Sequence, residues 1–231
     1  MKTKNTHELL LYRDGLMLIL NKPAGIPVHA GPKGGPNMED YFPDLQFGLP
    51  NPPGLAHRLD RDTSGCLILG RHRQALRKLG NLFMQGQITK TYWAVVEGIP
   101  AEPKGTIDKP LRKKTSDTRS WWMEIHEEGQ HAVTDYEVLG SADGISWLAL
   151  YPKTGRTHQI RVHLASLGCP IIGDPVYGNK EMNLTRKGPP MQLHARAVKV
   201  PLYEKKEPIL TEAPPPEYMQ VFLNACGYKA A

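Results

Sequence analysis

The chain has little cysteine, and the cysteines that it has are poorly placed for a shared role. Cys66, Cys169 and Cys226 are the only three among 231 residues, and no two of them have the spacing of metal ligands. An odd number of widely separated cysteines argues against a disulfide framework and against a zinc knuckle. Cys66 and Cys169 have apolar neighbours, so we expect them to be small residues of the hydrophobic core.

Long apolar runs are also missing. The longest, Leu16 to Leu20, is far too short to cross a bilayer. The N-terminal residues MKTKNTHELL contain no apolar stretch of the length found in a signal peptide. No repeat with a period of about 20 to 50 residues is found, which argues against a solenoid or a propeller. Together with the cysteine content, these absences predict a protein of the cytoplasm with no membrane association.

Glycine, proline and positive charge are plentiful. The chain has 22 glycines and 21 prolines, which indicates many turns and short strands rather than a helical bundle. The net charge is +6 and the isoelectric point is about 9.2. A basic protein of this kind favours a polyanionic partner.

Hydrophobic periodicity predicts short strands with a few helices inserted among them. Asp14-Gly15 lies between two short apolar runs, which is typical of a hairpin. The expected strands are 9–12, 16–20, 66–69, 90–98, 132–139 and 146–151, and the expected helices are 73–85, 157–167 and 217–226. For the second helix we expect Thr157 as N-cap and Gly168 just after its end. Residues 201–216 are rich in proline and lysine and are expected to be a segment that runs over the surface.

The order of these elements predicts the fold class. Strands and helices do not alternate in the rhythm of a parallel sheet, and no glycine-rich turn joins a strand to a helix. We therefore predict an α+β fold with a mixed, largely antiparallel sheet flanked by helices and loops. No linker divides the sequence, so residues 1–231 are expected to form a single domain.

Three segments combine charged or aromatic residues with a constrained backbone. They are HRLDRDTSG at 57–65, KTYWAVVEG at 90–98 and GRTHQIRVHLASLG at 155–168. The first alone would be interpreted as an exposed turn, and the second as a strand whose tyrosine packs in the core. In the third, His158 and His163 are five residues apart and do not share a helix face well, so a metal site is not expected there.

Together and in this order, the three segments resemble the motifs of the RluA-type pseudouridine synthases. HRLDRDTSG is similar to that family's HRLDxxTSG, KTYWAVVEG to its KxYxAxVxG, and residues 155–178 to its GRxHQxRxHxxxxGxPxxGDxxYG segment. DGLMLILNKPAGIPVH at 14–29 and LHARAV at 193–198 also match. The resemblance covers residues from about 10 to 202, and five ordered matches are not expected by chance.

The resemblance implies three catalytic residues. Asp60 matches the catalytic aspartate, Tyr92 the tyrosine that lies against the target base, and Arg161 the basic residue that pairs with the aspartate. Pairing with arginine suits this chemistry, because arginine stays charged in a closed pocket and favours the ionised form of a neighbouring carboxylate.

The resemblance also implies residues that bind the substrate. Ile160 matches an apolar position that borders the uracil, and Arg58 matches an arginine that helps to hold the flipped-out conformation of the RNA. Arg156, at the start of the third segment, is counted with them as a substrate-binding residue. Asp62 falls on a variable position of the first motif and is given no catalytic role.

The implied partner is RNA, with ribosomal RNA and transfer RNA both reasonable substrates. The reaction conserves the atoms of the nucleotide, so no cofactor and no metal are expected, and no obligate protein partner is evident. Larger members of the family carry a small RNA-binding module ahead of the catalytic domain. Here the motifs begin near residue 10, so that module is expected to be absent and loops of the catalytic domain are expected to select the substrate.

Two other functions were weighed against this one. A catalytically silent RNA-binding protein of the same fold would have been signalled by loss of Asp60, Tyr92 or Arg161, and all three are present. An unrelated hydrolase could use Asp60 and Asp62 with His57, but it needs two carboxylates that face each other. Their spacing in a turn does not ensure that arrangement.

A basic run lies between two expected strands, at 109–119. Its cations are Lys109, Arg112, Lys113, Lys114 and Arg119, against two aspartates, and Trp121 and Trp122 follow at once. The ordinary interpretation of such a run is a solvated loop. The functional interpretation is a loop that binds RNA phosphates and stacks an exposed tryptophan on a base.

Overall fold

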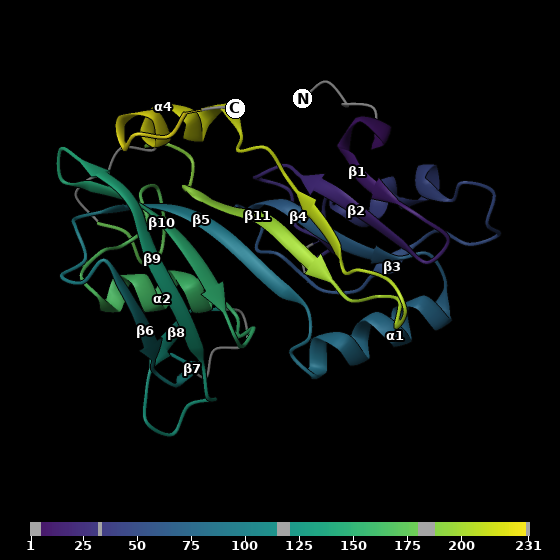
Figure 1. Cartoon of the computed structure of the whole chain (residues 1–231), viewed down its shortest axis with the longest axis horizontal. Helices are drawn as coiled ribbons and strands as arrows, with labels where there is room; N and C mark the ends of the chain where they lie inside the picture. The colour runs from purple at the N-terminus through teal and green to yellow at the C-terminus, as the bar shows by residue number, and fades with distance from the viewer. Residues whose placement is uncertain (1–5, 32–33, 115–120, 180–187, 230–231) are drawn as a thin grey trace. The chain divides into compact units, whose positions relative to one another are not determined.

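The computed structural model describes residues 6–31, 34–114, 121–179 and 188–229. Contacts between Cα atoms divide the chain into two compact units, Met1–Lys90 with Ala195–Pro214 (unit 1) and Thr91–His194 with Pro215–Ala231 (unit 2). Strands β5 (Thr89–Glu97) and β11 (Leu193–Val200) each carry the chain from one unit to the other. Figure 1 shows the elements of both units, and each unit is described by itself below.

Unit 1 is built on an antiparallel sheet. In chain order its elements are η1 (Thr6–Leu9), β1 (Leu10–Arg13), β2 (Met17–Lys22), η2 (Met38–Leu45), β3 (Gly54–Leu55), β4 (Ser64–Gly70), α1 (Arg73–Met84), the second part of β11 and β12 (Ile209–Glu212). Strand β2 pairs with β1 on one side and with β4 on the other, and β12 pairs with β11. The hairpin expected around Asp14-Gly15 is therefore confirmed.

Close packing at glycines places helix α1 on this sheet. A Cβ atom at Gly70 or at Gly54 would collide with the side chain of Leu76, so the two glycines give this helix room to approach β3 and β4. Leu79 and Leu82 are buried on the same helix face, as the spacing of the leucines predicted. The helix ends as expected before Gly86, which has a positive φ of 66°.

Unit 2 is built on antiparallel strands with a helix on each face. In chain order its elements are the second part of β5, β6 (Lys104–Asp108), β7 (Leu111–Lys113), β8 (Met123–Ile125), β9 (Val133–Ala142), β10 (Ile145–Pro152), α2 (Gln159–Ser166), the start of β11 and α4 (Glu217–Ala225). Strand β10 pairs with β5 and β9, and β9 pairs with β6. Strands β7 and β8 form a separate two-stranded hairpin.

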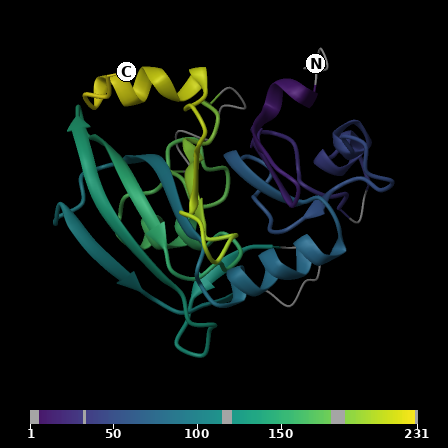
Figure 2. The same cartoon turned by 45° about the vertical axis from the view of Figure 1, so that its right-hand side comes forward.

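The alternation of side chains along β5 decides which helix meets which face. Ala94 and Val96 belong to the hydrophobic cluster that holds Ile160 and Leu164 of α2. Val95 belongs to another cluster with residues of α4, and Trp93 packs against it. Helices α2 and α4 thus lie on opposite faces of the strands. Figure 2 shows α4, in yellow, from a second direction. The two faces predicted for this strand are confirmed.

Several sequence expectations are confirmed and one is wrong. The α+β fold with a largely antiparallel sheet is present, and all three cysteines are buried and free. The expected N-cap Thr157 is wrong, because α2 begins at Gln159 after His158, whose backbone is left-handed with φ of 53°. Residues 203–210 of the surface segment expected at 201–216 are exposed or half-buried, and the segment also contains β12, which pairs with β11. None of the described helices has the length and apolar character needed to cross a membrane.

Candidate active site

The first motif forms the loop between β3 and β4, and its histidine is structural. The Nε2 atom of His57 accepts a hydrogen bond of 2.9 Å from the backbone N–H of Ile68, and its ring packs against Phe83 at 4.9 Å. Burial lowers the pKa of His57 to about 4, and the nearby charge of Lys90 acts in the same direction. A neutral histidine that already accepts a backbone hydrogen bond does not suit the general-base role that the hydrolase alternative gave it.

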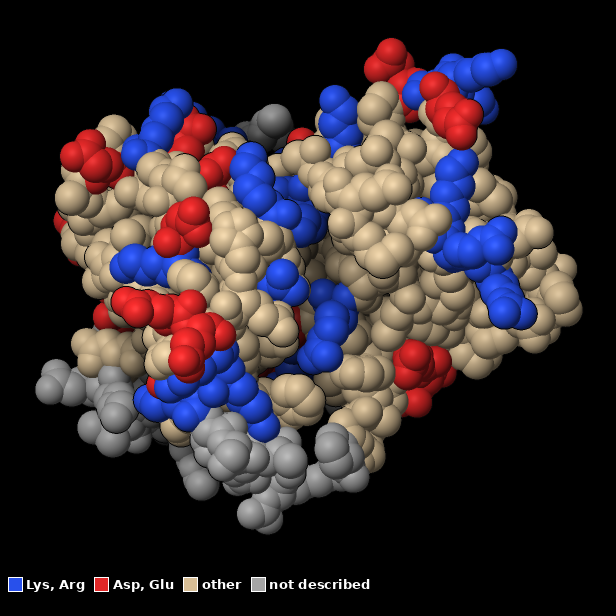
Figure 3. Space-filling view, turned by 90° about the horizontal axis from the view of Figure 1, so that it is seen from below, with Lys and Arg blue, Asp and Glu red and all other residues tan. Residues whose placement is uncertain are grey.

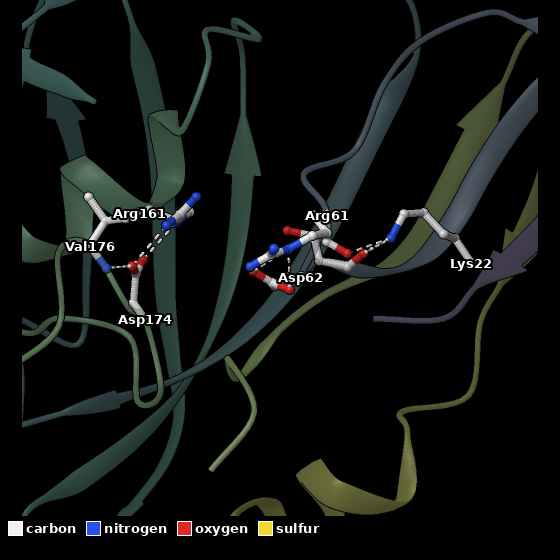
Figure 4. A network of polar contacts seen from close by, with 7 residues as sticks. Lys22, Arg61, Asp62, Arg161, Asp174 and Val176 are labelled. Atoms are coloured by element: carbon white, nitrogen blue, oxygen red, sulfur yellow. Dashed lines mark hydrogen bonds and ion pairs between the residues drawn. The ribbon is translucent and has the colours of Figure 1, made fainter. Parts of the chain in front are cut away.

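Lys22, at the end of β2, holds the loop that contains Asp60. Its side chain is fully buried, and its Nζ atom donates to the backbone oxygens of Pro23, Arg61 and Thr63 at 2.8, 2.9 and 2.9 Å. Two of these oxygens belong to the residues on either side of Asp62, and one of these residues, Arg61, directly follows Asp60 in the chain. The ammonium group therefore fixes the path of the backbone through the motif (Figure 4).

The register of β2 and β4 explains why Lys22 can reach this loop. Lys22 is paired with Gly65, the last residue of the motif, at the start of β4. Gly65 has a positive φ of 103°, and a Cβ atom there would collide with the backbone of Ala195 on the neighbouring β11. Only glycine suits both the conformation and the close approach, so the glycine of the motif sets where the loop ends.

Burial makes the charge of Lys22 easy to remove. It lowers the pKa of Lys22 to about 8, although the charges of Asp62 and Asp60 act in the opposite direction. These effects mean that both carboxylates lie close enough to favour the ammonium form. The two aspartates differ in their surroundings, since Asp62 forms an ion pair of 3.1 Å with its neighbour Arg61, whose side chain is mostly exposed. The backbone oxygen of Asp60 accepts from the N–H of Thr63 at 3.2 Å, which closes a turn.

In unit 2, Arg161 of α2 forms a buried ion pair with Asp174. The Nε and one terminal nitrogen of the guanidinium donate to the two carboxylate oxygens at 2.7 and 2.8 Å (Figure 4). The backbone N–H groups of Val176 and Tyr177 donate to the same carboxylate. Burial alone would raise the pKa of Asp174, but the hydrogen bonds and charge of Arg161 and the two amides outweigh it and lower that pKa.

Tyr92 and Ile160 lie in one hydrophobic cluster of unit 2. Ile160 is buried within it, and Tyr92 is half-buried and packs against it from β5. Their association follows from the alternation of β5, which turns Tyr92, Ala94 and Val96 toward α2. The structure thus brings together the two residues that were expected to border the base.

Arg156 and Arg58 are both exposed. The Nε atom of Arg156 donates to the backbone oxygen of His131 at 3.1 Å, and its backbone N–H donates to Gln159. Arg58 lies in the loop of unit 1 that contains Asp60. A role in substrate binding stays a prediction for both, as do the catalytic roles of Asp60, Tyr92 and Arg161 and the pairing of Asp60 with Arg161.

A buried polar network holds α2 in place below Arg161. Gln159 donates to Val133 O and to the hydroxyl of Thr134, at 3.0 Å each, and its Oε1 accepts from Thr154. His163 lies between Thr134 Oγ1 and the backbone oxygen of Lys109, at 2.9 and 3.0 Å. Burial lowers the pKa of His163, so the ring is neutral in this network. His163, for which no metal site was expected, is thus a structural residue.

Sequence reasoning missed Lys22, Asp174 and Tyr177 as contributors to these groups. Lys22 stands in NKPAG and the other two in GDPVYG, so all three lie inside segments that carried the resemblance. A buried lysine and a buried carboxylate cannot be recognised from spacing alone, because burial depends on contacts distant in sequence. Among the described residues, no three His, Cys, Asp or Glu side chains come together as a group that could hold a metal ion.

Comparison with known proteins identifies the family of this chain. The family model for RNA pseudouridylate synthases matches residues 16–166. An uncharacterised RNA pseudouridine synthase of Zymomonas mobilis is 45% identical over 210 residues, which cover 90% of this chain and 94% of that protein. Ribosomal large subunit pseudouridine synthase C of Buchnera aphidicola is 36% identical over 214 residues, 90% of this chain and 67% of that protein.

A solved structure has the same fold. Human RNA pseudouridylate synthase domain containing 4 superposes with a TM-score of 0.79 at 27% identity, over 96% of this chain and 94% of that one. The chain belongs to the RNA pseudouridine synthase family and is an isomerase that converts uridine in RNA to pseudouridine.

Proposed function

We propose that this enzyme isomerises particular uridines of ribosomal or transfer RNA, with Asp60 as its essential carboxylate. The observation that carries the choice of Asp60 is that Lys22 binds the backbone of its loop, through the carbonyl oxygens of Arg61 and Thr63, one and three residues after Asp60. Burying a cation costs desolvation free energy. The hydrogen bonds that this cation donates to the backbone hold the short loop in a single conformation. Asp62, by contrast, forms its ion pair at the surface with its own neighbour.

The chemistry requires an ionised carboxylate at this position. Pseudouridylation breaks the bond between uracil N1 and the ribose, turns the base, and forms a bond from C5 to the same ribose carbon. The proton on C5 is released and N1 gains one, so atoms balance without a co-reactant. Attack on carbon and removal of a ribose proton are the two roles open to Asp60, and both need the ionised form.

The residues of unit 2 complete the proposed machinery. Tyr92 lies against the target base, and Ile160 borders it as an apolar neighbour, in line with the shared cluster of these two side chains. Arg161 supplies a permanent positive charge for the carboxylate of Asp60, and its ion pair with Asp174 sets the direction of its guanidinium. Arg58 and Arg156 bind the RNA, which offsets the few kcal/mol that extruding a base costs.

The hairpin of β7 and β8 is the proposed contact with RNA phosphates. The cations of this hairpin are not equally available to RNA phosphates, because Arg112 forms ion pairs with Glu124 at 3.0 Å and with Glu128 at 3.7 Å. Figure 3 shows the same intermixing on one face of the molecule, where some groups of Lys and Arg lie directly beside Asp and Glu. Trp121 and Trp122 are exposed, as a role in base stacking needs. Arg119 lies outside the described residues.

Lys113 and Lys114 are therefore the main candidates in this hairpin. The ammonium group of Lys113 lies 5.8 Å from the centre of the Trp121 ring, so a cation and an aromatic face are presented together. Lys109 instead donates to Ser166 of α2 at 3.4 Å.

The target and the catalytic residue are tested together by mapping pseudouridines. Total RNA from cells with and without the protein should differ at one or a few uridines of ribosomal or transfer RNA. Restoring the parent should recover these sites, Asp60→Ala and Asp60→Asn should not, and Asp62→Ala should recover most of them. Recovery by Asp60→Ala, or a larger loss with Asp62→Ala, would refute the assignment. Wild-type levels of binding without turnover in Asp60→Ala would show that RNA recognition is separate from catalysis.

The enzyme is further proposed to act in the cytoplasm without cofactor, metal or obligate protein partner. The reaction is a rearrangement within one nucleotide, which gives a metal or cofactor no required part. Purified protein should release tritium from C5-labelled uridine in RNA after treatment with excess chelator, provided the RNA is refolded first. Activity that is lost with chelator and restored by zinc would contradict this proposal.

A further inference from the structure

Tyr177 joins the β7–β8 hairpin to the start of helix α2. Its hydroxyl oxygen accepts a hydrogen bond of 2.8 Å from the backbone N–H of Met123, the first residue of β8. The same hydroxyl lies 2.9 Å from Nδ1 of His158, the residue that precedes α2. A phenol oxygen can accept one hydrogen bond and donate another, so the hydroxyl donates to His158 when Nδ1 of that ring carries no proton. One phenol group thus connects a strand of the hairpin with the helix that bears Arg161.

The rest of Tyr177 lies against the ion pair of unit 2. The guanidinium of Arg161 is 5.1 Å from the centre of the Tyr177 ring, over its face. The backbone N–H of Tyr177 donates to Asp174 at 3.1 Å. Tyr177 also packs against a small hydrophobic cluster, whose members come from the hairpin, from the segment before β9 and from α2. They are Leu111, Ala132 and Val162, with Met123 packed against them.

The backbone at His158 is also informative. His158 has a left-handed conformation with φ of 53°, which residues other than glycine adopt rarely. Its ring packs edge to face on Tyr177 at 5.6 Å in addition to the hydrogen bond. The contact with Tyr177 offsets the cost of this conformation, so the beginning of α2 and the tyrosine depend on each other.

We propose that Tyr177 is a positioning residue that fixes the β7–β8 hairpin on helix α2, so that Lys113 and Lys114 meet the RNA in register with Arg161. This rests on the proposed RNA contact of the hairpin and goes beyond it, because it names the side chain that sets where the hairpin lies. The hydroxyl is the essential part, since it makes the hydrogen bonds to both Met123 and His158. The ring alone would preserve the contact with Arg161.

Tyr177→Phe removes the hydroxyl and keeps the ring. Loss of a neutral hydrogen bond should weaken RNA binding between about threefold and tenfold, with the chemical step at saturating RNA nearly unchanged. The matched control is Tyr136→Phe, because Tyr136 is a buried phenol of the same unit in the cluster around Ile160. The control should bind RNA as the parent does.

A double-mutant comparison separates positioning from a general loss of stability. In a Lys113→Ala, Lys114→Ala background the hairpin has lost its proposed phosphate contacts, so adding Tyr177→Phe should change affinity less than about twofold. A purely structural role would weaken binding by the same factor in both backgrounds. Equal factors, or parental affinity of Tyr177→Phe alone, would overturn the proposal.

Hydrogen exchange tests the link without any RNA. In Tyr177→Phe the amide of Met123 should exchange at least about tenfold faster, because its acceptor is gone. The amide of Leu111, which donates to Gln130 at 2.9 Å, should keep its protection. Unchanged protection of Met123 would overturn the proposal. Absence of pseudouridine formation by the parent would instead refute the proposed function. The two failures can be told apart, because RNA binding and hydrogen exchange are measured without turnover.

Discussion

Lys22 in unit 1 and Arg161 in unit 2 are both buried cations, but they are held in opposite ways. Lys22 donates to three neutral backbone oxygens, whereas two nitrogens of Arg161 donate to one carboxylate. In the first case a cation positions a loop, and in the second a carboxylate positions a cation. The difference matches the residue types, because lysine has three donors that can point to separate acceptors and arginine has a planar fork that fits a carboxylate.

The two arrangements also differ in what pH can change. Arginine keeps its charge in proteins, so the ion pair with Asp174 persists as long as the carboxylate is ionised. Lysine can lose its proton, and burial brings the pKa of Lys22 to about 8. The conformation of the loop of Asp60 therefore depends on a cation that can lose its proton. The ion pair beside Asp174 involves a cation that cannot.

The largest effect is expected from removing the carboxylate of the buried pair. Asp174→Ala leaves a buried guanidinium without its partner, which should cost about 3–5 kcal/mol of unfolding free energy and most of the activity. Urea unfolding measures the first and tritium release from C5-labelled uridine the second. Asp62→Ala is the matched control, because its pair with Arg61 is exposed and should contribute about 1 kcal/mol or less. Similar losses for the two variants would remove the distinction between these ion pairs.

Replacing Lys22 should cost less stability but should affect turnover strongly. Lys22→Met removes a costly buried charge and leaves the oxygens of Pro23, Arg61 and Thr63 without this donor, so a net loss of about 1–3 kcal/mol is expected. Turnover should fall by more than the loss of folded protein explains, since the loop of Asp60 is no longer fixed. The comparison needs single-turnover rates at saturating RNA on protein shown to be folded by near-ultraviolet circular dichroism. Lys206→Met, at an exposed lysine, is the control.

If the rate of Lys22→Met equals that of the parent once corrected for folded fraction, the loop does not need its cation. Lys22 would then contribute to stability alone, and its hydrogen bonds to the loop would no longer support the assignment of Asp60 as the essential carboxylate.

The pH dependence distinguishes the two cations directly. Above pH 8 Lys22 becomes neutral and keeps two donors for three acceptors, so the single-turnover rate should fall with a midpoint near that pH. Stability should not fall with it. The folded-state pKa of about 8 lies below the unfolded value of 10.5, so between them the unfolded chain binds more protons and this group makes unfolding harder as pH rises.

The measurement is a rate profile from pH 6.5 to 9.5, taken alongside urea midpoints at the same values. Lys22→Arg keeps its charge throughout, so a folded Lys22→Arg variant should move the alkaline decline to higher pH. An unchanged decline in that variant would assign it to another group.

The smallest effect is expected from the cations of the hairpin, because Arg112 and Lys114 are exposed and Lys113 is only half-buried. Replacing Arg112, Lys113 and Lys114 together by alanine should weaken RNA affinity at low salt and lower the slope of log affinity against log salt. Each lost phosphate contact should lower that slope by roughly 0.7–0.9. Arg112→Ala alone should contribute least, because Glu124 and Glu128 already neutralise it. The rate at saturating RNA should stay nearly unchanged.

Parental affinity and parental slope in the triple variant would show that this hairpin is a solvated turn. The surface that binds RNA would then have to be sought on other elements.

The sequence predicted those features that depend on local pattern. The alternation in KTYWAVVEG placed Tyr92 on the face that α2 covers, and the spacing of leucines located α1. The motifs predicted catalytic roles for Asp60 and Arg161, because a motif is recognised from residue order alone. These roles stay predictions. The N-cap at Thr157 was wrong, since the side chain of Gln159 accepts from the N–H of Arg156 and delays the first helical turn.

Roles that depend on partners distant in sequence were decided by tertiary structure alone. Nothing in the order of residues says that Lys22 reaches carbonyl oxygens 39 and 41 positions away, or that Arg161 binds a carboxylate 13 positions away. The sequence left open a hydrolase role for His57, and burial and hydrogen bonding make both His57 and His163 neutral structural residues. The sequence determined which groups are present and on which face of an element they lie. Folding determined their charge and direction, because both depend on desolvation and on hydrogen-bond partners that only the folded chain brings near.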